Sequence, residues 1–287
     1  MAVDLHSHSA YSDGSDTPTE LVRRAIECGL TAVALTDHDT LEGVEEAQAA
    51  ADGIELIPGT ELSLRRAEGG MHLVVLWLPP SQGPLQDRLA EIQHARGGRN
   101  QAIVDELTRL GMPVTLDEVL VEAGEGSVGR PHIAAVMVAK GYVPDIKTAF
   151  DMWLATGAPA YVKRLLLTPE EGIGLAIESG AVPILAHPHT LGVNRAAEMA
   201  DLLDELKGYG LIGLEAHYSG YHQHERYGYD DLARRFGLIP SGGSDYHGTY
   251  KHGIDLGTGY GDLYVPERIM ETLREASRPL NNACHPS

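Results

Sequence analysis

Short apolar segments recur along the chain, and each runs directly into a cluster of polar residues that contains His, Asp or Glu. Seven segments show this pattern: residues 2–5, 32–35, 55–57, 71–78, 181–186, 211–214 and 238–240. A stretch with helical spacing separates most of them, and two such stretches begin with the helix-start signals Thr17-Pro18-Thr19-Glu20 and Thr168-Pro169-Glu170-Glu171. Strands that alternate with helices predict a parallel sheet, and seven such units favour an α/β barrel over an open sheet.

The alternation breaks between about residues 79 and 163. There the sequence predicts helices over 85–110, 133–140 and 145–154, without strands that end in polar clusters. We therefore interpret 79–163 as an inserted helical subdomain, and 1–78 together with 164–287 as the barrel domain.

The charge balance limits the partners of such a chain. It has 41 acidic and 22 basic side chains and a formal charge of −19, which argues against general binding to duplex DNA or to anionic membranes. No apolar run approaches the roughly 18 residues of a membrane helix, and Met1-Ala2-Val3-Asp4 shows no leader pattern, so we expect a cytoplasmic protein. Cys28 and Cys284 lack a CxxC spacing, which leaves His and carboxylates as metal ligands.

Polar residues that follow parallel strands of a barrel converge at one end of it, although they lie far apart in the sequence. His6 and His8 are spaced so that both imidazoles point to the same face of an extended strand. Other ionisable residues lie at or beside strand ends: Asp13, Asp37, His38, Glu61, His72, His187, Asp245 and His247. Because burial of so many ionisable groups is costly without compensation, we expect divalent cations here, with Glu61 able to bridge two of them.

Six ordered motifs closely resemble those of the PHP (polymerase and histidinol phosphatase) family. They are His6-Ser7-His8-Ser9 with Asp13-Gly14, Thr36-Asp37-His38-Asp39, Gly59-Thr60-Glu61, His72, Ala186-His187-Pro188 and Gly243-Ser244-Asp245-Tyr246-His247. The resemblance implies a distorted (β/α)7 TIM-like barrel that holds two or three divalent ions per chain, with manganese as the first choice and zinc or iron as alternatives.

The resemblance also implies a distribution of the ligands. One ion would take His6, His8, Glu61 and Asp245, a second would take Glu61, His72 and His187, and a third would take Asp13, His38 and His247. Many family members carry His where this chain has Asp13. We interpret Asp37 and Asp39, which flank His38, as residues that orient metal-bound imidazoles.

The helical insertion resembles a subgroup of the family that hydrolyses nucleoside 3′,5′-bisphosphates and trims short RNAs from the 5′ end. The matching residues are Gly129-Arg130-Pro131-His132-Ile133-Ala134. Guanidinium groups are preferred partners of phosphate, so we expect the insertion to bind the second phosphate of the substrate. The candidate substrate-binding residues are Arg96, Arg99, Asn100, Arg130 and His132.

The sequence therefore predicts a metal-dependent phosphoesterase in which Glu61, Asp245 and His189 are the catalytic candidates, with His189 as one histidine able to protonate a leaving group. The predicted partners are a small nucleotide and short single-stranded RNA carrying a 5′-phosphate. Two alternatives stay open. One is a phosphatase of the histidinol-phosphate type, and the other is a catalytically silent PHP module that binds metal for structure or regulation.

Overall fold

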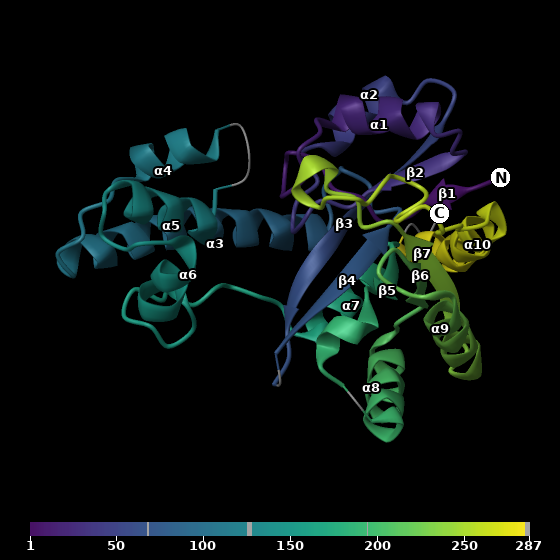
Figure 1. Cartoon of the computed structure of the whole chain (residues 1–287). Coiled ribbons are helices and arrows are strands. Elements are labelled where there is room, and N and C mark those ends of the chain that lie inside the picture. Colours follow the sequence, from purple (N-terminus) through teal and green to yellow (C-terminus); the bar gives the residue numbers. More distant parts are fainter. Residues whose placement is uncertain (68, 125–127, 194, 285–287) are drawn as a thin grey trace. The chain divides into compact units, whose positions relative to one another are not determined.

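The computed structural model describes residues 1–67, 69–124, 128–193 and 195–284, which Figure 1 traces in sequence order. The chain forms two compact units, Met1–Leu89 with Leu166–Ser287, and Ala90–Leu165. We name the first the barrel unit and the second the helical unit. The domain limits expected from the sequence, at 79 and 163, stay a prediction.

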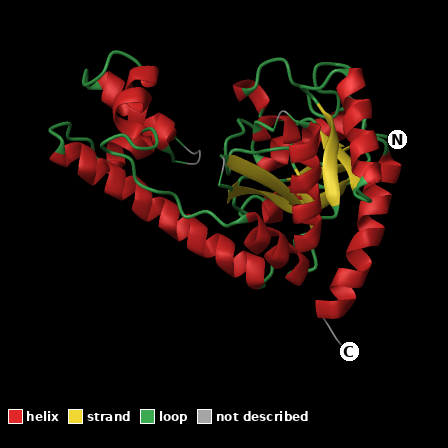
Figure 2. Ribbon diagram, turned by 90° about the horizontal axis from the view of Figure 1, so that it is seen from below, coloured by secondary structure: helices red, strands yellow, loops and turns green. Residues whose placement is uncertain are grey.

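Seven strands form one sheet in the barrel unit, and their order in the sheet follows their order in the chain. The strands are β1 (Val3–Asp4), β2 (Ala32–Leu35), β3 (Glu55–Arg65), β4 (Gly70–Leu76), β5 (Val182–Leu185), β6 (Gly213–Tyr218) and β7 (Ile239–Gly243). The helices that flank them (Figure 2) are α1 (Pro18–Glu27), α2 (Val44–Ala50), α7 (Pro169–Glu178), α8 (Ala196–Tyr209), α9 (Gln223–Arg235) and α10 (Glu267–Cys284).

Strand β4 runs antiparallel to both of its neighbours, β3 and β5, so the expectation of a wholly parallel sheet is wrong at this strand. The reason is the connection before it. Only residues 66–69 separate the end of β3 at Arg65 from the start of β4 at Gly70, whereas a parallel connection needs a dozen or more residues. β3 is also much longer than the predicted strand 55–57, because it continues through Glu61 and along the hairpin to Arg65.

The first and last strands approach each other and nearly close the sheet into a barrel, which confirms the predicted fold class. The backbone amide of Leu5 donates to the carbonyl of Gly242 at 3.2 Å, and the amide of Asp245 donates to the carbonyl of His6 at 2.9 Å. A Cβ added at Gly243 would lie 2.4 Å from the backbone nitrogen of His6. Only glycine permits this close approach of β7 to β1.

The barrel interior is apolar at one end and polar at the other. Ala32 and Ala34 belong to a buried cluster with residues of β1, β3, β4 and β5, whereas Val33 and Leu35 point outward and pack with α1 and α2. Helix α10 contributes to the interior cluster beside the start of β1, where the amide of Val3 bonds to the segment before that helix. Apolar side chains thus fill the end at which β1 begins, and we call the opposite end, reached by β1 and β7, the polar end.

Two helix starts of the barrel unit follow the predicted signals. Thr17 and Thr168 cap α1 and α7, and in each case the glutamate three residues later bonds back to the amide of the capping threonine. Satisfying otherwise unpaired amides in this way stabilises a helix end by about 1 kcal/mol.

The helical unit has an apolar core of its own. Its helices are the greater part of α3 (Pro84–Arg109), α4 (Leu116–Ala123), α5 (Arg130–Ala139), α6 (Ile146–Ala149) and the π-helix η1 (Phe150–Leu154). Ile103, Leu107, Val119, Ile133 and Met137 form its centre and are each at most 8% exposed. The predicted helices 85–110, 133–140 and 145–154 correspond to α3, α5 and α6 with η1, whereas α4 was not predicted.

Within the described residues, we find no helix that combines the length and the apolar character needed to cross a membrane. The cellular location stays a prediction.

Candidate metal centre

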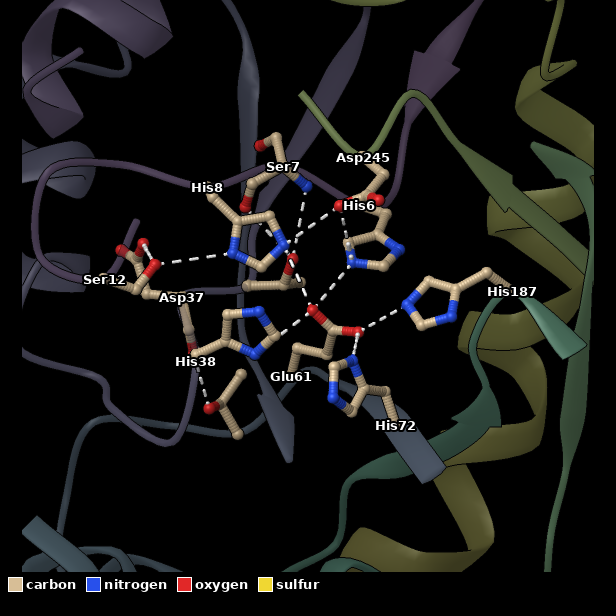
Figure 3. Close-up of polar contacts among 12 residues, drawn as sticks. His6, Ser7, His8, Ser12, Asp37, His38, Glu61, His72, His187 and Asp245 are labelled. Carbon is tan, nitrogen blue, oxygen red and sulfur yellow. Dashed lines mark hydrogen bonds and ion pairs between the residues drawn. The ribbon is translucent and has the colours of Figure 1, made fainter. Parts of the chain in front are cut away.

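Nine ionisable residues converge at the polar end of the barrel. They are Asp13, His247 and the seven residues His6, His8, His38, Glu61, His72, His187 and Asp245, which are labelled in Figure 3. His6 and His8 follow β1, and their ring centroids lie 5.2 Å apart. The ring of His247, which follows β7, lies 4.2 Å from that of His8, and the ring of His38, which follows β2, lies 4.7 Å from it. The approach of β7 to β1 therefore brings the residues that follow the first strand and those that follow the last strand into one cluster.

Glu61 lies within β3 and His72 lies near the start of β4, so neither residue lies in a loop that follows a strand. His72 lies near the beginning of β4, and because β4 is antiparallel, its beginning reaches the polar end of its neighbours. In the β3–β4 pairing Ser63 lies opposite His72, so Glu61 is the diagonal neighbour of His72 on the same face. The antiparallel β3–β4 hairpin therefore places Glu61 and His72 at the polar end of the barrel.

The carboxylate of Glu61 lies at the centre of the cluster, and its two oxygens face different histidines. Oε1 lies 2.9 Å from His72 Nδ1 and 2.9 Å from His187 Nε2. Oε2 lies 3.2–3.3 Å from nitrogens of three others, His6, His8 and His38. The geometry suits a carboxylate that holds one ion with each oxygen.

Asp245 supplies a second buried carboxylate. Its Oδ1 lies 3.4 Å from His8 Nε2 and 3.6 Å from His6 Nε2. Its Oδ2 accepts a hydrogen bond of 2.9 Å from the Tyr218 hydroxyl and lies 2.5 Å from Lys251 Nζ. With Oδ2 occupied in this way, Oδ1 is the oxygen that faces the histidines. Asp245 also has a φ of +54°, a backbone conformation that is strained for a side chain of this size.

Asp13 lies at the outer edge of the cluster, with its side chain about half exposed. Its Oδ1 lies 3.3 Å from His247 Nε2, and its Oδ2 lies 3.6 Å from His38 Nε2. Burial alone would raise the pKa of Asp13, but the hydrogen bond from His247 and the nearby His38 and His8 outweigh burial and lower it.

Three groups of side chains could each hold an ion. They are His6, His8, Glu61 and Asp245; His38, Glu61 and His72; and His8, Asp13, His38 and His247. The first has the predicted composition. In the second, His38 takes the place expected of His187, although His187 Nε2 lies 2.9 Å from the same oxygen of Glu61 as His72 Nδ1. In the third, His8 joins the predicted set. Metal binding at these nine residues stays a prediction.

The donor atoms fit divalent cations. Among the described residues, the buried nitrogens without a hydrogen-bond partner include His6 Nε2, His8 Nε2 and His38 Nδ1, all of which face Glu61. A buried polar atom without a partner costs about 1–3 kcal/mol, so positive charge between nitrogen and carboxylate would stabilise the cluster. Burial alone would lower the pKa of His8, but Asp245 and Glu61 outweigh it and raise the pKa to about 9. Imidazole and carboxylate together suit Mn, Zn and Fe.

Two residues beside the ligands, Asp37 and Asp39, were expected to orient imidazoles. Asp37 accepts hydrogen bonds from the hydroxyls of Ser9, at 2.6 Å, and Ser12, at 2.5 Å, and Ser12 lies 3.4 Å from His8 Nδ1. Asp37 therefore reaches an imidazole through a serine and shapes the loop after β1. Asp39 accepts the backbone N–H of Ser63 at 2.8 Å and so ties the loop after β2 to β3.

Glu215 and Lys251 received no role in the sequence interpretation, yet both contact predicted ligands. Glu215 Oε1 lies 2.9 Å from His6 Nδ1, and Lys251 contacts Asp245. Glu215 directly follows the predicted strand 211–214, so the pattern that singled out Asp37 also applies to it. No comparable local pattern singles out Lys251.

The predicted proton donor, His189, lies beside the ligands and is only partly covered from solvent. Its ring centroid lies 6.3 Å from that of His187, and its Nδ1 lies 3.0 Å from the Tyr221 hydroxyl. Partial burial, followed by the neighbouring His187, lowers the pKa of His189.

The helical unit gathers four arginines, Arg96, Arg99, Arg130 and Arg164. Arg99 Nε donates to the Val162 carbonyl at 2.9 Å, and Arg130 Nη1 donates to the Leu154 carbonyl at 2.9 Å. Partial burial, then Arg130 and Arg164, and to a smaller extent Arg96, lower the pKa of Arg99 to about 10. This accumulation of like charge would be relieved by an anion. We call these four residues the arginine cluster.

The other two substrate-binding candidates make contacts that hold the unit together. Asn100 is buried and donates to the Val128 carbonyl at 3.1 Å, and His132 Nδ1 accepts the Gly129 amide at 3.2 Å at the start of α5. Their roles toward a substrate stay predictions.

A family model described as "PHP domain" matches residues 4–113. A 3′,5′-nucleoside bisphosphate phosphatase of Chromobacterium violaceum is 31% identical over 258 residues, covering 89% of this chain and 90% of that protein. A 5′-3′ exoribonuclease of Haemophilus influenzae is 35% identical over 247 residues, covering 85% and 89%.

Two solved structures resemble the whole chain. A metal-dependent phosphoesterase from Bifidobacterium adolescentis shares 31% identity with a TM-score of 0.75 and covers 95% of each chain. An amidohydrolase from Chromobacterium violaceum with bound sulfate shares 30% identity with a TM-score of 0.76, covering 96% of this chain and 97% of that one.

Proposed function

The chain belongs to the PHP family and is a metal-dependent hydrolase of phosphate esters, and from this premise we propose that its substrate is a nucleoside 3′,5′-bisphosphate. Hydrolysis at the 3′ position would yield the 5′-monophosphate and inorganic phosphate. Manganese is the ion we propose first, with zinc or iron as alternatives. A relative that covers nearly the same length carries this activity in its name.

When bound, the ions would neutralise charge on the reacting phosphate and lower the pKa of the attacking water. The protein's own residues hold the ions and the reacting group in place. Glu61, with one oxygen toward each side of the histidine cluster, would hold two neighbouring ions. Asp245, fixed by Tyr218 and Lys251, would present Oδ1 to one of them. His189 is the proposed proton donor to the leaving alcohol, through the Nε2 that lies across the ring from its contact with Tyr221.

The arginine cluster is the observation that favours a bisphosphate as the substrate. A simple monophosphate offers only the group that reacts at the metal centre, whereas a bisphosphate has a second dianion that requires its own partner. We propose that Arg99 and Arg130 bind this second phosphate, and that Arg96, Asn100 and His132 support the same site. Guanidinium groups bind phosphate through two parallel hydrogen bonds, which also selects its orientation.

The proposed orientation is tested with adenosine 3′,5′-bisphosphate in water enriched in ¹⁸O under single-turnover conditions. We expect adenosine 5′-monophosphate as the nucleotide product and one heavy oxygen in the released phosphate, because water attacks phosphorus. Adenosine 3′-monophosphate as product would show that the substrate binds in the opposite orientation. Heavy oxygen in the nucleoside would contradict attack at phosphorus.

Short RNA with a 5′-phosphate is a second candidate substrate, favoured by the 35% identity to a 5′-3′ exoribonuclease. We expect the chain to shorten a 5′-phosphorylated trinucleotide from its 5′ end and to act poorly on the same trinucleotide with a 5′-hydroxyl. Equal rates on both would remove the role proposed for the arginine cluster. Histidinol phosphate tests the alternative of a phosphatase of the histidinol-phosphate type, because this substrate lacks a second phosphate.

A further inference from the structure

Glu215 is a buried acid that lies outside the three groups of possible ligands and touches two of the predicted ligand residues. Its side chain is 3% exposed. Oε1 lies 2.9 Å from His6 Nδ1, and Oε2 accepts the backbone N–H of His187 at 2.7 Å. The two oxygens of one carboxylate therefore reach residues that follow β1 and β5, on either side of Glu61.

Strand β6 places Glu215 near His6 and His187. It lies in β6, beside β5, and the pairing of β6 with β7 shifts register between Glu215 and His217. His187, which follows β5, has a φ of +24°, a conformation that is strained in a residue other than glycine. The bond from the His187 amide to Glu215 helps to hold this strained backbone.

We infer that Glu215 is a positioning residue of the metal centre, which fixes the imidazole of His6 and the backbone of His187 so that both side chains face Glu61. A carboxylate only accepts hydrogen bonds, so the proton of the neutral His6 ring lies on Nδ1. The lone pair on Nε2 then faces Glu61 and Asp245, in the form that binds a cation. Such a partner also makes the imidazole a stronger ligand.

The chemistry of this contact requires an acid and not merely a polar side chain of the same size. Both partners of Glu215, the His6 Nδ1–H and the His187 N–H, are donors. Glutamine has one acceptor oxygen and one amide NH₂, so it would satisfy one partner and turn a donor toward the other. Glu215→Gln therefore changes the contact while it preserves the volume.

The test measures metal directly, because the inference rests on the proposed ligands and not on the proposed substrate. Metal-free wild type and Glu215→Gln are titrated with Mn²⁺ by calorimetry and with Co²⁺ by visible absorption. We expect the variant to bind the tightest Mn²⁺ about 10–100-fold more weakly and to give a changed Co²⁺ spectrum.

Asp230→Asn is the matched control. Asp230 Oδ1 lies 3.6 Å from Nε2 of His217, the histidine of β6, which belongs to none of the three groups. The control should bind Mn²⁺ and Co²⁺ as the wild type does. A Glu215→Gln variant that melts at a lower temperature but binds both ions like the wild type would overturn the inference, because Glu215 would then serve the fold alone.

A measurement on the unmutated chain covers the case in which Glu215→Gln does not fold. In zinc-loaded protein labelled with ¹⁵N-histidine, the His6 signals are assigned by their loss in His6→Asn. A proton on Nδ1 of His6 supports the inference, and a proton-free Nδ1 contradicts it. Neither readout involves a substrate, so failure of the bisphosphate proposal would leave both results unchanged.

Discussion

The barrel unit and the helical unit differ in where they keep their ionisable groups. Of the buried polar side chains among the described residues, Asn100 is the only one in the helical unit, whereas the barrel unit buries acids and histidines together at its polar end. In the helical unit, acids such as Glu106 and Glu118 lie at the surface and pair with basic side chains. Burial of charge is costly, so its restriction to one unit indicates where ions compensate for it.

This difference separates two tasks. The metal centre depends on residues from every part of the barrel, so few of them can change independently. The helical unit folds around an ordinary apolar core and carries its arginines beside that core, so its cationic residues can change without disturbing the buried cluster. We therefore expect the chemistry to depend on the barrel unit and the choice of substrate on the helical unit.

The largest expected effect is at Glu61. Glu61→Gln removes the charge of the carboxylate that faces both sides of the histidine cluster, and a chelator should produce a comparable loss. Since metals supply several kcal/mol of transition-state stabilisation, we expect kcat to fall by about a thousandfold or more on every substrate. Metal content and kcat are measured together. Glu55→Gln, at the exposed start of the same strand, is the control. Active wild type with less than one ion per chain would refute the metal centre.

The next effect should depend on the substrate. Arg130→Ala should reduce kcat/KM for adenosine 3′,5′-bisphosphate by the value of a charge-assisted contact, about 1.5–3 kcal/mol or roughly ten- to over a hundredfold. A simple monophosphate ester should be affected much less. Arg99→Ala should behave in the same way, and Arg109→Ala, an exposed arginine of α3 paired with Glu106, is the control. Equal losses on both substrates would contradict the division of tasks.

A third experiment uses the two tryptophans of the chain, one in each unit. Trp77 packs against the barrel interior, and Trp153 packs against the core of the helical unit. In Trp153→Phe the remaining fluorescence reports the barrel unit, and in Trp77→Phe it reports the helical unit. Metal at ten times its Kd should stabilise the barrel unit against urea by about 1.4 kcal/mol and leave the helical unit unchanged. Equal shifts would show that the two units unfold as one.

The smallest effect concerns pH and the helical unit alone. The contact with Lys140, followed by the hydrogen bond from the Thr115 amide, lowers the pKa of Glu118. A carboxyl whose pKa is lowered in the folded protein increases the free energy of unfolding at pH values above its ordinary pKa. This contribution is lost as the pH falls through the lowered pKa. Glu118→Gln should therefore reduce the urea midpoint, read from Trp153, at pH 7 but not at pH 3. Glu122→Gln, on the same helix, is the control.

Local sequence patterns predicted the helices and strands of the barrel better than the side-chain contacts between distant strands. The helix caps at Thr17 and Thr168 follow from neighbouring residues, and the structure confirms both. The antiparallel β4 was missed because the hairpin after β3 interrupts an otherwise regular alternation. The sequence nevertheless singled out Glu61 and His72, since the motifs do not depend on strand direction.

The residues that support the site were harder to foresee. Glu215 meets His6 across 209 positions of sequence, and the contact depends on β1 and β6 belonging to one nearly closed sheet. Asp37 was expected to orient imidazoles, and its contact with His8 runs through the hydroxyl of Ser12, which the sequence did not single out. Periodicity and spacing describe neighbours along the chain, and these contacts connect residues that the barrel alone brings together.

The approach of β1 to β7 has a consequence for biosynthesis. Asp4 accepts the amide of Ser244, a contact that spans 240 positions, and Asp245 reaches His6 only once these strands lie together. A ribosome makes β1 before β7, so the nascent chain presents His6 and His8, followed by Glu61, before Asp245, an acidic partner of both histidines, exists. Contacts between such distant segments also form slowly. We therefore expect the predicted ligand set to be complete only after β7 has joined β1.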